Sequence, residues 1–163
     1  VRWIVLTCLF TSISGGAEME LFSTWLCSES SVGIFRRHRN LQGVSNNIII
    51  GSGFNSVIKD HSVSSHAEII AINAASKKLN NHRLPDCDLY VTLEPCHMCA
   101  KAIVDARINN VYFATKEPKN GSIVSRDHFF EKEHLNHRVS YFSGLMQEEA
   151  SELLKSFFQT LRD

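Results

Sequence analysis

A chain of 163 residues, 44% of them hydrophobic and 21% charged, has the size and composition of one ordinary globular domain. This composition excludes a collagen, a disordered tail and a long coiled coil. Seventeen Lys and Arg balance seventeen Asp and Glu. The chain therefore has no overall basic field, and any binding of nucleic acid must use a local patch.

The cysteines and the apolar start of the chain bear on its compartment. Five cysteines are an odd number and too few for a disulfide scaffold: Cys8, Cys27, Cys87, Cys96 and Cys99. Arg2 and the apolar run over 3–10 loosely imitate a signal peptide. However, thiolate ligands suit a reducing compartment, and no run approaches the roughly 20 apolar residues that span a membrane. We therefore expect a cytoplasmic protein with no membrane partner.

Short β-rich runs alternate with longer helical patterns from residue 44 onward, which favours an α/β architecture. Strands are expected over 44–54, 89–93, 111–114 and 139–142, and helices over 67–79, 96–107 and 147–161. Ser64 and Ser65 offer an N-cap for the first helix, and Asn80 and Asn81 end it. Few residues separate the second helix from the third strand. The two strands that flank this helix are therefore predicted to be parallel neighbours.

Two short motifs place metal-ligating side chains at the starts of two helices. His66-Ala67-Glu68 opens the first helix, and Pro95-Cys96-His97-Met98-Cys99 opens the second. One imidazole and two thiolates suit a single Zn²⁺ ion, and the positive end of a helix dipole favours thiolates. Three protein ligands leave the fourth tetrahedral position open to water, which is typical of a catalytic zinc.

Glu68 lies two residues from the expected ligand His66. A carboxylate beside such a metal takes a proton from water and delivers it to a leaving group. The combination resembles the His-x-Glu and Pro-Cys-x-x-Cys signature of zinc nucleobase deaminases. The alternative is a structural zinc with a fourth protein ligand, for which Cys87 and His97 are the nearest candidates. His97 is expected to point elsewhere, because it lies between two ligands on one turn.

The segment 89–103, Leu-Tyr-Val-Thr-Leu-Glu-Pro-Cys-His-Met-Cys-Ala-Lys-Ala-Ile, resembles bacterial tRNA-specific adenosine deaminases. The resemblance extends over about residues 44–163. It implies a three-layer α-β-α, cytidine deaminase-like fold with a central mixed sheet, and a homodimer. It also implies conversion of adenosine to inosine at the wobble position of a tRNA anticodon loop. The alternative activity is deamination of a free base or nucleotide of the guanine or cytosine type.

The same resemblance implies roles for individual residues. His66, Cys96 and Cys99 hold zinc, water activated there attacks adenine C6, and Glu68 carries the proton to the departing ammonia. Asn55 matches the asparagine that contacts the target nucleoside, although a plain turn residue remains an alternative. Residues near positions that approach the anticodon loop are Glu117, Lys119, Phe157 and Arg162. Alternatively, Phe157 is a core residue at helical spacing, and Lys119 and Arg162 are solvated.

The resemblance stops abruptly upstream of residue 44. A central strand is expected there, but the chain has a poor β pattern and the basic cluster Arg36-Arg37-His38-Arg39. We divide the chain into an atypical segment, 1–43, and a zinc-dependent deaminase domain, 44–163. The segment is a divergent N-terminus, a basic arm for RNA, or a translated frameshift, the hypothesis that we favour. A sheet lacking this strand would expose an edge, so a degenerate, non-catalytic zinc-binding remnant is the alternative to an enzyme.

Overall fold

The computed structural model describes residues 32–39 and 45–160, and the predicted RNA-contact residue Arg162 lies outside them. The elements in chain order are β1 (Val32–Arg39), β2 (Ser45–Gly53), α2 (Ala67–Leu79), β3 (Cys87–Leu93), α3 (His97–Asp105), β4 (Asn110–Thr115), the 3₁₀ turn η1 (Phe129–Glu131), β5 (Ser140–Ser143) and α4 (Gln147–Thr160). Every strand and helix that we predicted from residue 44 onward is present, with bounds that differ by a few residues.

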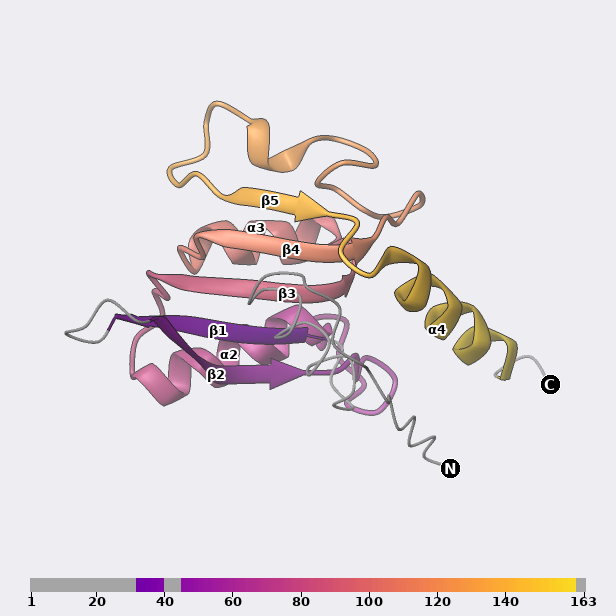
Figure 1. The fold of residues 1–163 in the computed structure, drawn as a ribbon, viewed down its shortest axis with the longest axis horizontal. Helices are drawn as coiled ribbons and strands as arrows, with labels where there is room; N and C mark the ends of the chain where they lie inside the picture. The colour runs from indigo at the N-terminus through magenta and orange to yellow at the C-terminus, as the bar shows by residue number, and fades with distance from the viewer. Residues whose placement is uncertain (1–31, 40–44, 161–163) are drawn as a thin grey trace.

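The strands form one mixed sheet in the order β2-β1-β3-β4-β5 (Figure 1). The strand β1 is antiparallel to both of its neighbours, β2 and β3. The strands β3, β4 and β5 are mutually parallel, which confirms the prediction for the strands that flank α3. As a result β2, β3 and β4 all run in the same direction, and their carboxyl ends lie at one edge of the sheet.

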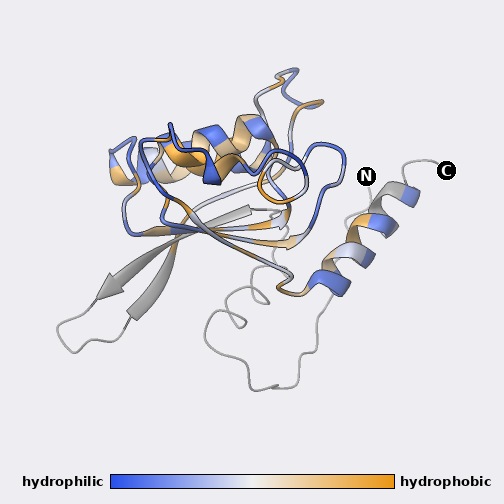
Figure 2. Cartoon of the chain, turned by 90° about the horizontal axis from the view of Figure 1, so that it is seen from above, coloured by the Kyte–Doolittle hydropathy of each residue, from blue (hydrophilic) through white to orange (hydrophobic). Residues whose placement is uncertain are grey.

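Helices contact the sheet on both of its faces. The helices α2 and α3 lie on one face, where apolar side chains such as Leu89, Val111 and Phe113 are fully buried beneath them. The other face carries Tyr90 and Tyr112, which pack with Ala150 near the start of α4. The fold is therefore the expected three-layer α-β-α arrangement. In Figure 2, α4 leans away from the sheet beyond that first turn, and Leu153 on its predicted apolar face is exposed. None of the described helices is long and apolar enough to cross a membrane.

The bounds of α2 follow local sequence at its end but not at its start. Asn80 adopts the left-handed conformation, with φ of 49°, and its amide and the following one bond back to the last turn, as predicted. The predicted N-cap at Ser64 and Ser65 was wrong, because the N-cap position is occupied by His66, whose side chain makes no capping hydrogen bond. A residue that serves the site therefore replaces the usual capping residue.

The strand β1 supplies the central strand that the sequence before residue 44 left in question. Its whole length pairs with β2, but only Val32–Arg36 pairs with β3. Three residues of the basic cluster pair with β2 alone, because β3 begins at the partner of Arg36: Arg37, His38 and Arg39. The backbone thus completes the sheet, while most of the basic cluster lies in a two-stranded extension past its central part.

Candidate metal centre and active site

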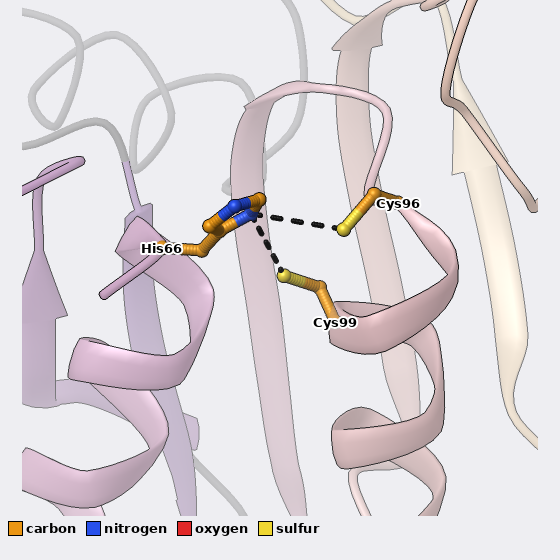
Figure 3. A group of neighbouring side chains, drawn as sticks. All are labelled: His66, Cys96 and Cys99. Carbon is orange, nitrogen blue, oxygen red and sulfur yellow. Dashed lines mark hydrogen bonds between the residues drawn. The ribbon is translucent and has the colours of Figure 1, made fainter. Parts of the chain in front are cut away.

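Three side chains meet between the starts of α2 and α3 (Figure 3). His66 is the N-cap residue of α2, Cys96 is the N-cap residue of α3, and Cys99 lies in the first turn of α3. Both N-cap residues have extended backbone, with φ of −74°, so each side chain leaves its helix at the point where the preceding loop enters. Since α2 and α3 lie on the same face of the sheet, the imidazole faces the two thiols.

The spacing of these side chains fits a tetrahedral zinc ion. His66 Nδ1 lies 3.7 Å from Cys96 Sγ and 3.5 Å from Cys99 Sγ. Zinc bonds of about 2.0–2.1 Å to nitrogen and 2.3 Å to sulfur separate two tetrahedral ligands by about 3.5–3.6 Å. Among the described residues these three form the one group able to hold a metal, with ligand atoms all within 4.8 Å of one another. The donor set and its spacing therefore suit the ion that the sequence predicted.

The two thiols differ in acidity. The pKa of Cys96 falls to about 5, chiefly because the Cys99 thiol hydrogen-bonds to it, and burial opposes this change. The backbone amides of Cys99 and Met98 at the start of α3 lower that pKa further, as expected at a helix N-terminus. The pKa of Cys99 is raised by its hydrogen bond to Cys96 and by burial. The pair thus holds one thiolate, and a bound cation would favour the second.

Glu68 lies beside the ligand group on the first turn of α2. Its side chain is 8% exposed, and burial raises the pKa of its carboxyl group. The nearby Cys96 adds to this increase, whereas the backbone amide of Glu68, the Cys99 thiol and His66 oppose it. The hydrogen bond between the Cys99 thiol and the Glu68 carboxyl group puts Glu68 in contact with the ligand group. The structure therefore places Glu68 next to the three predicted ligands.

The two candidates for a fourth protein ligand point away from the group. Cys87 is fully buried at the start of β3, and its thiol contacts the carbonyl oxygen of Pro85 at 3.5 Å. His97 is exposed, and its Nδ1 lies 3.0 Å from a carboxylate oxygen of Asp127 while its ring packs on Phe129. Within the described residues, the arrangement is thus three protein ligands, which favours a catalytic over a structural zinc.

Three of the predicted substrate and RNA-contact residues lie at the same edge of the sheet as the ligand group, where β2, β3 and β4 end. Asn55 follows β2, is exposed, and accepts a hydrogen bond on Oδ1 from the Val57 amide at 3.2 Å, as a turn residue does. Glu117 and the exposed Lys119 follow β4, and the Glu117 carboxylate accepts a bond from the Lys119 amide at 2.9 Å. Phe157 belongs to the helix α4 rather than to these loops. The structure therefore brings Asn55, Glu117 and Lys119 to one edge but leaves Phe157 on a separate element.

Glu94 is a residue at the site to which the sequence analysis gave no role. It follows β3 directly, is 3% exposed, and accepts hydrogen bonds from the loop that follows β4. Burial alone would raise its pKa, but the hydrogen bonds from Ser125, Val124 and Glu117 outweigh burial, and the pKa is lowered. The available signal was a carboxylate at the end of a strand expected to be buried, directly before the Pro-Cys-x-x-Cys motif. Its partners, which lie more than twenty residues away, had no such signal.

Comparison with known sequences agrees with this geometry. The model of the MafB19-like deaminase family matches residues 38–162. The tRNA-specific adenosine deaminase of Haemophilus influenzae is 45% identical over 115 residues, covering 71% of this chain and 66% of the relative. That of Aquifex aeolicus is 44% identical over 115 residues, covering 71% of this chain and 76% of the relative. The matched part of the chain thus spans just under two thirds of the Haemophilus influenzae protein.

Comparison with solved structures gives the same fold. A structure from a study of A-to-I editing by tRNA:A34 deaminases at the wobble position of transfer RNA matches with a TM-score of 0.64. It is 38% identical and covers 75% of this chain and 83% of its own. Guanine deaminase from Nitrosomonas europaea matches with a TM-score of 0.62 at 22% identity, covering 85% of this chain and 79% of its own, which shows the fold alone. The chain therefore belongs to the MafB19-like deaminase family and is a member of the tRNA-specific adenosine deaminases.

Proposed function

We propose that this chain is a zinc-dependent hydrolase that converts adenosine to inosine at the wobble position of a tRNA anticodon. The observation that carries the proposal is the spacing of His66, Cys96 and Cys99, which suits tetrahedral zinc, with the buried Glu68 beside them. One Zn²⁺ per chain is held by these three side chains. When bound, zinc activates water as a nucleophile near neutral pH.

Glu68 moves the proton in this reaction. A new bond forms between the oxygen of water and C6 of adenine, and the bond between C6 and the exocyclic nitrogen breaks. The Glu68 carboxylate accepts a proton from the attacking water and delivers it to the departing amine, which leaves as ammonia. The position of Glu68 on the turn that follows His66 supports this role, because its carboxyl group hydrogen-bonds with the Cys99 thiol without being one of the three ligands.

The substrate proposal rests on the edge of the sheet where β2, β3 and β4 end. A deaminase that acts on an RNA loop must splay out its target base and hold the flanking nucleotides. Asn55 is proposed to contact the target nucleoside, and Glu117 and Lys119 the anticodon loop, because they follow β2 and β4 at the edge of the sheet that carries the ligand group. Phe157 and Arg162 are proposed as further contacts on the resemblance alone. The named activity of the 44–45% identical relatives supports this class of substrate.

We further propose that the chain acts as a homodimer in the cytoplasm. The proposal of a dimer rests on the resemblance to tRNA-specific adenosine deaminases. The proposal of a cytoplasmic location rests on the thiols of the site, which suit a reducing compartment. Light scattering of the purified chain tests the dimer, for which a mass of twice 18.4 kDa is expected.

The experiment that tests the activity compares three substrates. The purified chain is incubated with an anticodon stem-loop carrying adenosine 34, with free cytosine and with free guanine, and the products are identified by mass. We expect inosine in the RNA and no change in either base. Conversion of a free base without inosine in the RNA would replace the proposal with the free-base alternative. No conversion by zinc-loaded protein would support the non-catalytic remnant.

A further inference from the structure

The loop that follows β4 makes several hydrogen bonds to one buried side chain beside the site. The Glu94 carboxylate accepts hydrogen bonds from the backbone amides of Glu117 at 3.1 Å, Ile123 at 2.9 Å, Val124 at 2.6 Å and Ser125 at 2.9 Å. The Ser125 hydroxyl donates a further short bond to it. These five donors come from both ends of residues 117–125, here called the 117–125 loop. A single buried carboxylate therefore closes this loop on itself.

The loop also lies against the backbone of a metal-ligand residue. Gly121 forms an isolated β-bridge with Cys96, and the Ser122 amide donates to the carbonyl oxygen of Pro95 at 3.0 Å. A Cβ atom at Gly121 would lie 2.5 Å from Cδ of Glu94 and 2.6 Å from the carbonyl oxygen of Glu117. Only glycine fits between the carboxylate and the loop backbone. The Glu94 carboxylate and the loop backbone therefore leave no room for a side chain at Gly121.

The ligands themselves do not depend on these bonds. The Cys96 carbonyl accepts from the Ala100 amide at 2.8 Å within α3, and the Glu94 amide donates to the Thr115 carbonyl at 2.9 Å at the end of the sheet. The strand before Cys96 and the helix after it are thus fixed by backbone bonds that do not use the Glu94 side chain. Loss of the carboxylate should release the 117–125 loop and leave the ligand group in place.

We infer that Glu94 is a positioning residue that holds the 117–125 loop as one wall of the substrate site beside Cys96. The inference rests on the proposed function for the identity of the substrate, but not for the anchoring itself. An amide cannot replace the carboxylate, because one of its two polar atoms donates and would face donors. If the loop of Glu94→Gln is in place about one tenth of the time, apparent affinity for substrate falls about tenfold.

The test uses the full chain loaded with zinc and compares Glu94→Gln with Glu133→Gln, a matched change at an exposed glutamate. We expect Glu94→Gln to retain one zinc per chain and to raise KM for the adenosine-34 stem-loop about tenfold, with a smaller change in kcat. Amides 123–125 should exchange hydrogen about tenfold faster or more, while β3 and α3 keep their protection. Glu133→Gln should match the wild type in all three measurements.

Two further variants separate anchoring from a general loss of fold. Glu94→Asp keeps the charge on a shorter side chain and should restore part of the affinity and of the exchange protection. Gly121→Ala pushes the loop from the intact carboxylate and should raise KM by a similar factor, with less than additive effect when combined with Glu94→Gln.

Several outcomes would overturn the inference. Unchanged exchange at amides 123–125 in Glu94→Gln would show that the carboxylate does not anchor the loop. Loss of zinc from Glu94→Gln would show that Glu94 supports the metal ligands rather than the wall. A fall of about tenfold in kcat with KM unchanged would show the same. If the wild-type chain forms no inosine, the proposed function fails, and the exchange measurement, which needs no RNA, still decides the anchoring.

Discussion

The unit β3-α3-β4 and the pair β1-β2 are built on opposite principles. In the first, consecutive elements pack on one another, β3 and β4 are parallel neighbours, and α3 covers them. In the second, β1 lies between β2 and β3, and the pairing with β3 joins residues more than fifty positions apart. The first unit was predictable from a single continuous window, residues 87–115. The second depends on partners that no local pattern reveals.

This difference also divides the site. Cys96 and Cys99 come from the local unit, and their spacing on α3 follows from the helix start alone. His66 and Glu68 come from α2, which packs on β2, and β2 pairs only with β1 within the described sheet. Within the sheet β1 is therefore the connection between the half that carries the imidazole and the half that carries the thiols, and α2 also packs against α3 in the shared core. The segment with the poorest sequence signal supports one side of the metal centre.

The largest expected effect comes from removing that join. A chain that starts at Val44 lacks β1, so β2 and α2 lose their connection to the rest of the sheet. We expect the stabilising free energy lost in this truncation to exceed the whole free energy of unfolding of such a domain, about 5–15 kcal/mol. The truncated chain should therefore show no cooperative thermal transition and bind no zinc. Circular dichroism and metal analysis measure both. Replacement of residues 1–43 by a family-like helix and strand should instead raise melting temperature and turnover.

A stable, zinc-loaded truncation would show that the local unit and α2 assemble without β1. A native chain more stable and more active than the repaired one would show that the original segment is a working part, against the frameshift hypothesis.

The second effect separates two residues within the site, one from each half. Glu68→Gln should keep about one zinc per chain and lose turnover by about 10²–10⁴-fold, because general acid-base transfer contributes that much. Cys99→Ser should lose the metal together with turnover, because it removes one of the three ligands. Metal analysis and deamination of the stem-loop are measured on the same preparations.

The assignment of roles would be wrong if Glu68→Gln stripped the zinc. It would also be wrong if Cys99→Ser changed neither zinc content nor turnover. The intact folding of both variants is checked by their thermal transitions.

The smallest expected effect concerns the basic cluster in the two-stranded extension. Under the frameshift hypothesis, Arg37→Gln combined with Arg39→Gln should leave RNA affinity and its salt dependence unchanged, because that hypothesis gives the cluster no phosphate contact to lose. Under the RNA-arm hypothesis, the slope of affinity against salt should flatten by about one unit per lost phosphate contact. Binding of the stem-loop at several salt concentrations distinguishes the two hypotheses.

The sequence by itself determined the elements from residue 44 onward and the chemistry of the metal centre. Asn80 marks the end of α2 and Pro95 the start of α3 by local signals. The spacing of His66, Cys96 and Cys99 at two helix starts predicts one candidate ligand group, with the Glu68 carboxyl group beside it. Only the tertiary structure decided that Val32–Arg39 is a central strand and that Glu94 holds the 117–125 loop. The physical reason is that a strand and a buried carboxylate are both stabilised by hydrogen-bond partners distant in the chain, and a local pattern carries no record of those partners.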